Sequence, residues 1–385
     1  MSATLAKIGT AAVVDRVRDA FAARRPLRIA GAGTWLVAGR PVQADDTLSV
    51  ADDRGIVEYV PGDLTLTARA GTRLSEIVAA TRAHGQWLPL DPWGDDDGTI
   101  GATLSTATAG PHAYAMGLPR DVALGVEFVS GTGAVIRGGG RVVKNVAGFD
   151  LTRLLVGSWG TLGVITEVSL RLRARPESTH TLALAIPPHH AALNELAVRL
   201  RALPFAPLAS EAVNARLAAL LGLSEQPILL MRVGGNEKSV RGQVALLREI
   251  GELASDVVDE AIWDSLRTIE KEVANATWRW SQLPAQFGDT WGAADRASRA
   301  IGGALIHGNP ARGVVRVIVA PSRVNAAELV RAASGFQGTV ALECLPPSAW
   351  ALVNSHSAGD PVSRAIRAKF DPAGILNPGV LGEGS

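Results

Sequence analysis

Hydrophobic and polar positions follow two different periods along this chain, which predicts a mixture of helices and strands. Residues 11–24 (AAVVDRVRDAFAAR) carry apolar side chains at helical spacing, with Val13, Val14, Val17 and Phe21 on one side. Short runs with strand-like patterns come next, at 27–30, 47–50, 56–60 and 64–69. The N-terminal region is therefore predicted to fold as one helix followed by several short strands.

Further elements frame a stretch rich in small and turn-forming residues. Residues 74–85 (LSEIVAATRAHG) predict a helix that stops at a glycine. Residues 123–130 and 134–137 predict a β-hairpin, and 163–173 predict a long strand. The segment at 99–106 (TIGATLST) is predicted to open a short helix.

A boundary is predicted at the turn-forming run Arg175-Pro176-Glu177-Ser178, because the pattern changes beyond it. The elements expected there are strands at 180–186, 227–233 and 313–319 and helices at 189–203, 237–250 and 323–334. This order predicts a second α+β domain. The tail at 364–379 is predicted to be a helix that ends at an Asp-Pro pair.

Composition excludes several classes of protein. A chain of 385 residues favours two or three domains, and 47% hydrophobic with 19% charged residues is typical of a globular protein. A net charge of +1 gives no pull toward nucleic acid or anionic membranes, and no apolar run approaches the ~20 residues of a membrane span. Cys344 is the single cysteine, so no disulfide, zinc site or iron–sulfur site is expected within the chain. Charged residues interrupt the N-terminal apolar stretch, so no signal peptide is expected and a cytoplasmic location fits.

Residues 141–167 (RVVKNVAGFDLTRLLVGSWGTLGVITE) are the most informative stretch of the chain. Glycines at 148, 157, 160 and 163 precede or interrupt a β-branched run, which lets the backbone approach a ligand closely. Two other loops also expose backbone, at 31–34 (GAGT) and at 90–110. Three such loops fit one long ligand, and a dinucleotide is the simplest.

Each loop alone has a plainer explanation. The 31–34 run lacks both the spacing of a Rossmann fingerprint and a following helix, and it is not a P-loop, so by itself it reads as a tight turn. Thr99 could be an ordinary helix cap. The density of Thr, Ser and Gly between 99 and 111 exceeds what one cap requires, which favours a diphosphate or ribityl chain.

The segments LDP (90–92), TIGATLSTATAGP (99–111), KNVAGFDLTRLLVGSWGTLGVITEVSLRLRARP (144–176) and FDPAGILNPG (370–379) resemble the vanillyl-alcohol-oxidase/PCMH-type FAD-linked oxidase superfamily. Within it the chain is most similar to the FAD-binding subunits of bacterial glycolate oxidase (glycolate dehydrogenase). The resemblance implies an α+β fold. A PCMH-type FAD-binding domain of two α/β subdomains (1–176) would precede an α+β cap domain with an antiparallel sheet (177–360), and a tail (361–385) would return to the FAD domain.

The resemblance also implies roles for individual residues. Gly31, Gly33 and Thr34 would hold the pyrophosphate, Pro92 would lie near the flavin, and Ile165 would offer backbone groups to the adenine end. The complete set of implied FAD-binding residues is Gly31, Ala32, Gly33, Thr34, Pro92, Thr99, Gly101, Ser105, Gly110, Gly160, Thr161, Gly163, Ile165 and Asn377.

Departures from the superfamily are equally informative. Residues 31–39 contain no His or Cys to tether the flavin, so noncovalent FAD is expected. The His-rich metal or substrate motif of related cap domains is missing, and the sequence identifies neither a metal site nor a general base. His307 could face the flavin, but a structural hydrogen bond is the commoner use of a lone histidine. Three arginines could each bind a substrate carboxylate, although an exposed salt bridge is the commoner role: Arg232, Arg279 and Arg316. Four tryptophans could line a pocket or a partner surface, although burial in the core is the commoner role: Trp263, Trp278, Trp280 and Trp291.

The function that the resemblance implies is oxidation of a small 2-hydroxy acid such as glycolate to its 2-oxo acid. Electrons would pass through FAD to a homologous FAD-containing catalytic subunit and an iron–sulfur subunit, and any membrane association would be made through these partners. Two alternatives stay open: a stand-alone FAD-dependent 2-hydroxy-acid dehydrogenase, and a flavin-free assembly scaffold.

Overall fold

The computed structural model describes residues 9–94, 96–140, 149–251, 253–255, 258–273, 275–320, 324–354 and 358–382. The Lys144–Gly148 part of the glycine-rich stretch lies outside these residues. The chain divides into two compact units. The first unit comprises Met1–Ala109, Gly117–Arg175 and Ser355–Ser385, and the second comprises Gly110–Met116 and Pro176–Asn354.

The first unit is built on a five-stranded antiparallel sheet with the order β3-β4-β8-β6-β7. Its predicted hairpin is confirmed, because β6 and β7 pair in antiparallel register. A parallel pair, β1-β2, and an antiparallel pair, β5-β9, complete its strands. The strands are β1 (Leu27–Ala30), β2 (Asp46–Ser49), β3 (Ile56–Val60), β4 (Thr65–Arg69), β5 (Gln86–Trp87), β6 (Ala123–Val129), β7 (Val135–Gly139), β8 (Val164–Arg171) and β9 (Arg173–Ala174).

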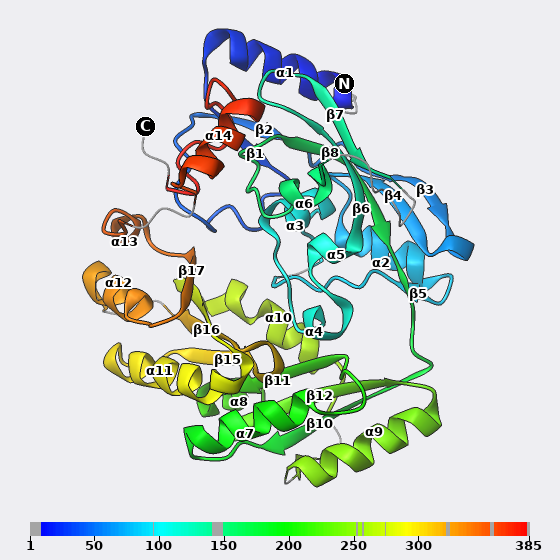
Figure 1. The fold of residues 1–385 in the computed structure, drawn as a ribbon, viewed down its shortest axis with the longest axis vertical. Helices are drawn as coiled ribbons and strands as arrows, with labels where there is room; N and C mark the ends of the chain where they lie inside the picture. Colours follow the sequence, from blue (N-terminus) through cyan, green and yellow to red (C-terminus); the bar gives the residue numbers. More distant parts are fainter. Residues whose placement is uncertain are drawn as a thin grey trace, which may run out of the picture. The chain divides into compact units, whose positions relative to one another are not determined.

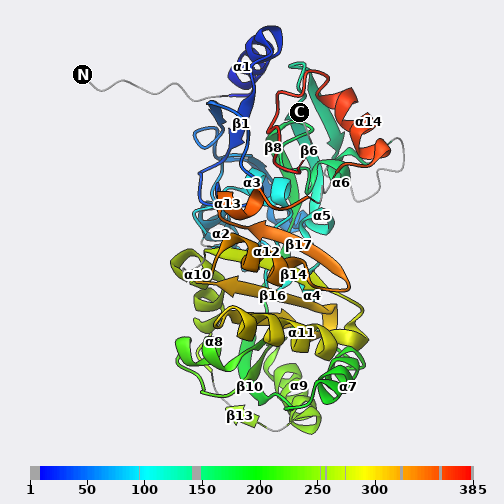
Figure 2. The same ribbon diagram turned by 90° about the vertical axis from the view of Figure 1, so that its left-hand side faces the viewer.

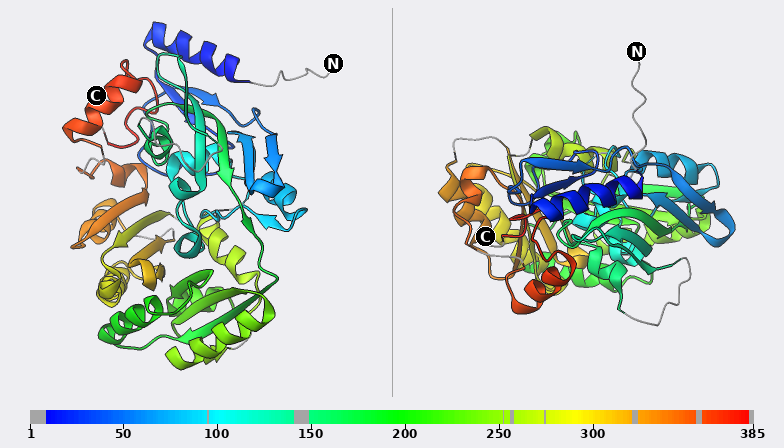
Figure 3. Two further views of the ribbon diagram at one scale, coloured as in Figure 1. Left: turned by 45° about the vertical axis from the view of Figure 1, so that its right-hand side comes forward. Right: turned by 90° about the horizontal axis from the view of Figure 1, so that it is seen from above.

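Four of the helices described in the first unit were predicted from sequence, whereas α5 and α6 were not. The first, α1, lies next to β6 (Figure 3) and buries Val13, Val14 and Val17 as its apolar spacing predicts, whereas Phe21 of the same predicted face is 36% exposed. The last, α14, ends at Phe370, directly before the Asp-Pro pair. The helices are α1 (Thr10–Ala23), α2 (Leu74–Arg82), α3 (Ile100–Thr106), α5 (Pro119–Val122), α6 (Leu151–Leu155) and α14 (Pro361–Phe370).

The C-terminal segment after α14 runs beside β1 (Figure 2). Leu376 forms a parallel bridge with Leu27, whose N–H donates to the Ile375 carbonyl at 2.7 Å. The Leu27 carbonyl in turn accepts from the Asn377 N–H at 3.0 Å. Residues from the end of the described chain therefore extend the β1-β2 pair.

The second unit is built on an eight-stranded antiparallel sheet with the order β13-β10-β12-β11-β15-β16-β14-β17 (Figure 1). Four of its strands, β11, β13, β14 and β17, were not predicted, and β15 was expected only as a strand that ends at His307. The strands are β10 (Ser178–Ala185), β11 (Ala209–Val213), β12 (Ile228–Gly235), β13 (Leu253–Ser255), β14 (Ala276–Ser281), β15 (Leu305–Asn309), β16 (Val314–Val319) and β17 (Thr339–Cys344).

The two faces of this sheet differ in character. Helices α7, α9, α11 and α12 contribute to one apolar core with alternate sheet residues such as Val315 and Val317. Arg316 points to the opposite face, where α10 supplies its partner Glu270. The helices are α4 (Ala113–Met116), α7 (His190–Arg201), α8 (Ala215–Leu220), α9 (Glu237–Ile250), α10 (Ile262–Val273), α11 (Phe287–Ala300), α12 (Ala326–Ser334) and α13 (Pro347–Trp350).

The four tryptophans singled out by sequence are buried in the second unit. Trp278 and Trp280 are 0% and 1% exposed, and Trp280 stacks on Phe336 with 4.7 Å between ring centroids. Trp263 and Trp291 are also buried. The core interpretation is therefore correct for all four. In the part of the chain that the structure describes, no helix combines the length and apolar character needed to cross a bilayer.

Cys344 at the end of β17 offers a direct probe of this core. Burial raises the pKa of its thiol to about 11. Only the thiolate reacts with disulfide reagents, so in the folded protein at pH 8 we expect labelling at least about 100-fold slower than in the denatured chain. Because Cys344 is the single cysteine, labelling by a chromogenic disulfide reagent reports on it alone. Equal rates in native and denatured protein would contradict the buried placement.

Candidate functional site

Four segments that are far apart in sequence meet in the first unit and form the candidate site. They are the loop after β1 (31–35), helix α3 with its preceding residue (99–106), the turn at 157–161 and the tail at 376–380.

The loop after β1 has the conformation that its glycines allow. Gly33 has φ +80°, and a Cβ built there would meet only Leu36 Cδ1, at 3.5 Å, so the space above it is open. Gly33 and Thr34 are exposed, and residues 31–45 contain no helix. The Arg28 guanidinium donates to the Leu36 carbonyl at 3.0 Å and closes the loop. The loop therefore presents backbone to a ligand but is not a Rossmann turn.

Thr99 lies directly against this loop. A Cβ built on Gly31 would be 2.2 Å from Thr99 Oγ1, so only glycine lets the two segments approach this closely. Thr99 occupies the N-cap position of α3, yet its side chain caps nothing. Its Oγ1 is buried, and within the described residues it has no hydrogen-bond partner. A buried hydroxyl without a protein partner beside an open glycine loop fits a ligand oxygen.

Helix α3 uses its first amides inside the protein. The Ile100 N–H donates to the Thr72 carbonyl and the Gly101 N–H donates to the Ala70 carbonyl, both at 2.9 Å. A Cβ on Gly101 would be 2.7 Å from Ala70 Cβ. Close packing against Ala70 therefore explains why residue 101 is glycine, without any contact to a cofactor.

The turn at 157–161 is fixed to the other end of α3. The Gly157 N–H donates to the Leu104 carbonyl at 3.0 Å, and the Trp159 N–H donates to the Ser105 carbonyl at 2.8 Å. Trp159 and Gly160 have φ +54° and +71°. The Ser158 hydroxyl is a second buried group that lacks a partner among the described residues. Two such hydroxyls, one at each end of α3, therefore border the site.

Other predicted residues lie in less exposed surroundings. A Cβ on Gly163 would be 2.4 Å from Phe128 Cδ2, and Ile165 lies in β8 opposite Phe128, so both belong to the sheet core. Pro92 is buried in the loop before α3. Gly110 belongs to the second unit, where its carbonyl accepts from the Ala113 N–H at 3.2 Å. FAD contact by each predicted residue stays a prediction.

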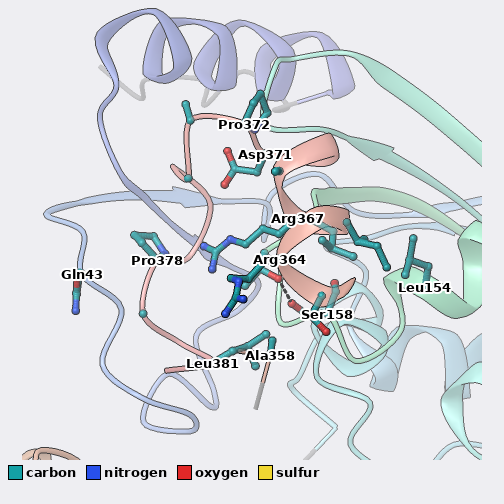
Figure 4. Close-up of a pocket in the computed structure, with 18 residues that line it drawn as sticks. Gln43, Leu154, Ser158, Ala358, Arg364, Arg367, Asp371, Pro372, Pro378 and Leu381 are labelled. Carbon is teal, nitrogen blue, oxygen red and sulfur yellow. Dashed lines mark hydrogen bonds between the residues drawn. The ribbon is translucent and has the colours of Figure 1, made fainter. Parts of the chain in front are cut away.

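A cavity of about 600 Å³ adjoins the turn and was not predicted from sequence (Figure 4). Ser158 and Thr161 contribute to one wall, and α14 contributes Arg364 and Arg367 to another. Burial raises the pKa of the nearby Asp371 carboxyl, although it accepts hydrogen bonds from the N–H groups of Leu376 and Ile375. The cavity thus combines apolar walls with two guanidinium groups and the Asp371 carboxyl, and both guanidinium groups already donate to backbone carbonyls.

Polar groups of the second unit are paired with one another. Arg232 Nε lies 2.6 Å from Glu260 Oε2, and His307 Nδ1 lies 3.1 Å from Glu211 Oε2. His307 is 1% exposed, in agreement with the structural interpretation of this histidine. His189, at the N-cap of α7, makes no capping hydrogen bond with its side chain.

Arg316 lies between two carboxylates in a buried charge cluster of this unit. Its guanidinium is 2.6 Å from Glu270 Oε2 and 2.7 Å from Glu343 Oε2. Burial alone would raise the pKa of Glu343, but Arg316 and Arg279 outweigh it and hold this pKa below its usual value. Arg232, Arg279 and Arg316, weighed as carboxylate-binding groups, therefore all lie in internal salt bridges, and Arg279 is the most exposed of them at 40%.

Comparison with known proteins indicates the cofactor of this chain. Residues 9–139, which hold the loop after β1 and helix α3, match the family model described as an FAD binding domain. The chain is similar to FAD-linked oxidases in this part of its sequence. Its cofactor is FAD. The open loop of this FAD-binding domain and the two buried hydroxyls beside it fit a dinucleotide.

Curated relatives of the FAD-linked oxidase superfamily match part of the chain. Glycolate oxidase subunit GlcE of Escherichia coli is 43% identical over 173 residues, which cover 44% of this chain and 49% of the relative. Glycolate oxidase subunit GlcD of Bacillus subtilis is 36% identical over 160 residues, which cover 41% of this chain and 34% of the relative. The matches thus span about half the length of these relatives or less.

Solved structures extend the likeness to nearly the whole fold. The 4-ethylphenol oxidase from Gulosibacter chungangensis superposes with a TM-score of 0.74, covering 97% of this chain and 88% of that chain, at 17% identity. An alkyldihydroxyacetonephosphate synthase gives a TM-score of 0.70 over 96% of this chain and 75% of that chain, at 15% identity. The predicted α+β fold of a PCMH-type FAD-linked oxidase is therefore confirmed.

Proposed function

We propose that this chain is the FAD-binding subunit of a glycolate (2-hydroxy-acid) oxidase or dehydrogenase complex. The observation that carries the proposal is the 43% identity to a glycolate oxidase subunit over 173 residues. The functional division proposed for the chain is 1–176 for cofactor binding, 177–360 as a cap, and 361–385 as a tail that returns to the cofactor domain. The bridge between Leu27 and Leu376 supports the last of these.

The proposed reaction oxidises the CH–OH group of glycolate to the carbonyl of glyoxylate. FAD, when bound, supplies this chemistry as a two-electron acceptor that takes the Cα hydride, while the hydroxyl proton leaves to a base. In this chain the loop after β1 and the Thr99 hydroxyl would bind the pyrophosphate, and Ser158 and Thr161 would border the rest of the cofactor. Partner subunits would accept the two electrons that this oxidation releases.

Internal pairing of the charged groups favours an accessory role over stand-alone catalysis. A substrate carboxylate is best bound by a guanidinium that is free to form two hydrogen bonds. Arg232 and Arg316 already lie within 2.7 Å of carboxylates, so binding substrate there would require those pairs to open. We therefore propose that turnover depends on a homologous FAD-containing subunit and an iron–sulfur subunit, through which any membrane association would also be made.

The test of this function is an activity assay with glycolate and an artificial electron acceptor. We expect the purified chain to bind FAD but to show turnover only after co-expression with its partner subunits. Full turnover by the isolated chain would replace the accessory role with a stand-alone dehydrogenase. A colourless protein that gains no flavin absorption on incubation with FAD would leave only a scaffold role.

FAD attachment can be tested separately. Residues 31–39 contain no His or Cys, and Cys344 lies in the second unit, so we expect FAD to be held without a covalent bond. Acid denaturation of the loaded protein should release all flavin into the supernatant. Flavin fluorescence that stays with the polypeptide on a denaturing gel would contradict this expectation.

A further inference from the structure

Asn377 occupies an unusual position in the candidate site. It has φ +45°, in the left-handed region that only asparagine, aspartate and glycine adopt readily, and it is 7% exposed. Its Oδ1 accepts from the Ile29 N–H at 2.7 Å, and its Nδ2 donates to the Trp159 carbonyl at 2.7 Å. One side chain thus joins the backbone at Ile29 to the backbone at Trp159, which lies 130 residues later in the sequence.

One bonded group lies directly before the first loop of the site, and the other lies within the turn at 157–161. Ile29 is in β1, two residues ahead of Gly31, and Trp159 immediately precedes Gly160. Trp159 also stacks on Trp35 of the first loop, with 5.8 Å between ring centroids. The carboxamide of Asn377 therefore sets the separation between the loop after β1 and the turn at 157–161.

Gly160 gives independent support for this arrangement. A Cβ built on Gly160 would lie 2.7 Å from Asn377 Nδ2, closer than any real side chain allows. The glycine is therefore required by the asparagine amide as well as by its φ of +71°. Asn377 and Gly160 form one packed unit, which predicts that their substitutions are not additive.

We propose that Asn377 is a positioning residue, which holds the two loops at the spacing that FAD requires and makes no contact with the cofactor itself. Both polar atoms of its side chain are already bonded to backbone, so FAD binding would be pre-organised by the tail. This inference rests on the proposed FAD-binding role of the two loops. Without the Asn377 side chain, FAD would have to order both loops when it binds. The free-energy cost of that ordering would raise the dissociation constant of FAD.

The first test is the variant Asn377→Gly, which keeps the left-handed conformation and removes both hydrogen bonds. We expect its FAD dissociation constant to rise by about 10- to 100-fold in a fluorescence titration of the FAD-free protein. Amide hydrogen exchange of Ile29 in the FAD-free protein should become faster at the same time. The matched control is Asn236→Gly, which removes one side-chain-to-backbone hydrogen bond at the N-cap of α9 and should change neither measurement.

A second variant, Asn377→Asp, separates the two bonds and serves if the glycine variant is too unstable to purify. It keeps an acceptor for the Ile29 N–H but loses the donor to the Trp159 carbonyl. We expect Ile29 to stay protected from exchange while FAD still binds more weakly than to the wild type. In the Asn377→Gly background, Gly160→Ala should also weaken FAD binding less than it does in the wild type.

The outcomes distinguish this inference from the proposed function. Weaker FAD binding by Asn377→Gly with unchanged Ile29 exchange in the FAD-free protein would indicate direct contact with FAD and overturn the positioning role. Additive effects of Gly160→Ala and Asn377→Gly would overturn it as well. If the wild-type protein bound no FAD, the proposed function would fall, whereas Ile29 exchange would still report whether Asn377 holds β1.

Discussion

Replacing Arg316 with Met is expected to lower the free energy of unfolding of the second unit by about 3–5 kcal/mol. The Arg316 side chain is 2% exposed and contacts two carboxylates, Glu270 and Glu343. Methionine approximates its volume but removes the cation that both carboxylates share, although Glu343 keeps the more exposed Arg279 at 3.7 Å. Urea denaturation followed by tryptophan fluorescence measures the change, because Trp278 and Trp280 lie in the core of the same sheet.

Two observations control this prediction. Arg299→Met removes a surface ion pair with Asp295, 69% and 40% exposed, and should cost less than about 1 kcal/mol. The difference in free energy of unfolding between the wild type and Arg316→Met should also become smaller as the pH is lowered. In the wild type, the lowered pKa of Glu343 means that its stabilising contribution is present above the unfolded pKa and lost as pH falls through the folded one. If this difference in free energy of unfolding stayed constant with pH, the loss of stability would not be electrostatic in origin.

Replacing Gly160 with Leu is expected to leave the purified protein without FAD. The side chain would displace the Asn377 carboxamide, so both of its hydrogen bonds would be lost and the turn at 157–161 would move away from the loop after β1. With each bond worth ~1 kcal/mol and further loss from the displaced turn, FAD should bind at least about 100-fold more weakly. The flavin absorption of the purified variant and its FAD titration measure the effect.

Gly222→Leu is a closely matched control. Gly222 also has φ +71°, but a Cβ built there meets nothing within 4 Å. It belongs to the second unit, so its substitution carries the same conformational cost without disturbing the cofactor loops. Equal loss of FAD in both variants would mean that Gly160 matters only for overall stability. Normal flavin content in Gly160→Leu would count heavily against the proposed site.

Local patterns predicted much of the first unit, but not the short elements α5, α6, β5 and β9. Helix α1, the β6-β7 hairpin and the end of α14 at an Asp-Pro pair are all encoded by residues close in sequence. Strand β14 was missed because Ala276–Ser281 (ATWRWS) places tryptophans on one face of the sheet and Thr277 and Arg279 on the other. Such a strand looks like neither a uniform apolar run nor an ordinary amphipathic strand with a solvated face.

The candidate site was predicted only at the level of its loops. The glycines at 31, 33 and 160 could be found from sequence because their setting between strands is local. The bonds made by Asn377 could not, since Ile29 is 348 residues away and an Asn-Pro-Gly run is also ordinary turn chemistry. The burial of Arg316 was missed for the same reason, because its partners Glu270 and Glu343 come from a distant helix and another strand.

The pairing of the tail with β1 has a consequence for biosynthesis. Strand β1 is made early, but residues 375–377, which bond to Leu27 and Ile29, are made more than 340 residues later. A ribosome adds about 5–20 residues per second, so the N-terminal part of the domain waits tens of seconds for its last segment. The cofactor loops reach their final spacing only after residue 377 has left the ribosome. If these loops bind FAD as proposed, nascent chains in which residue 377 has not yet emerged should carry none.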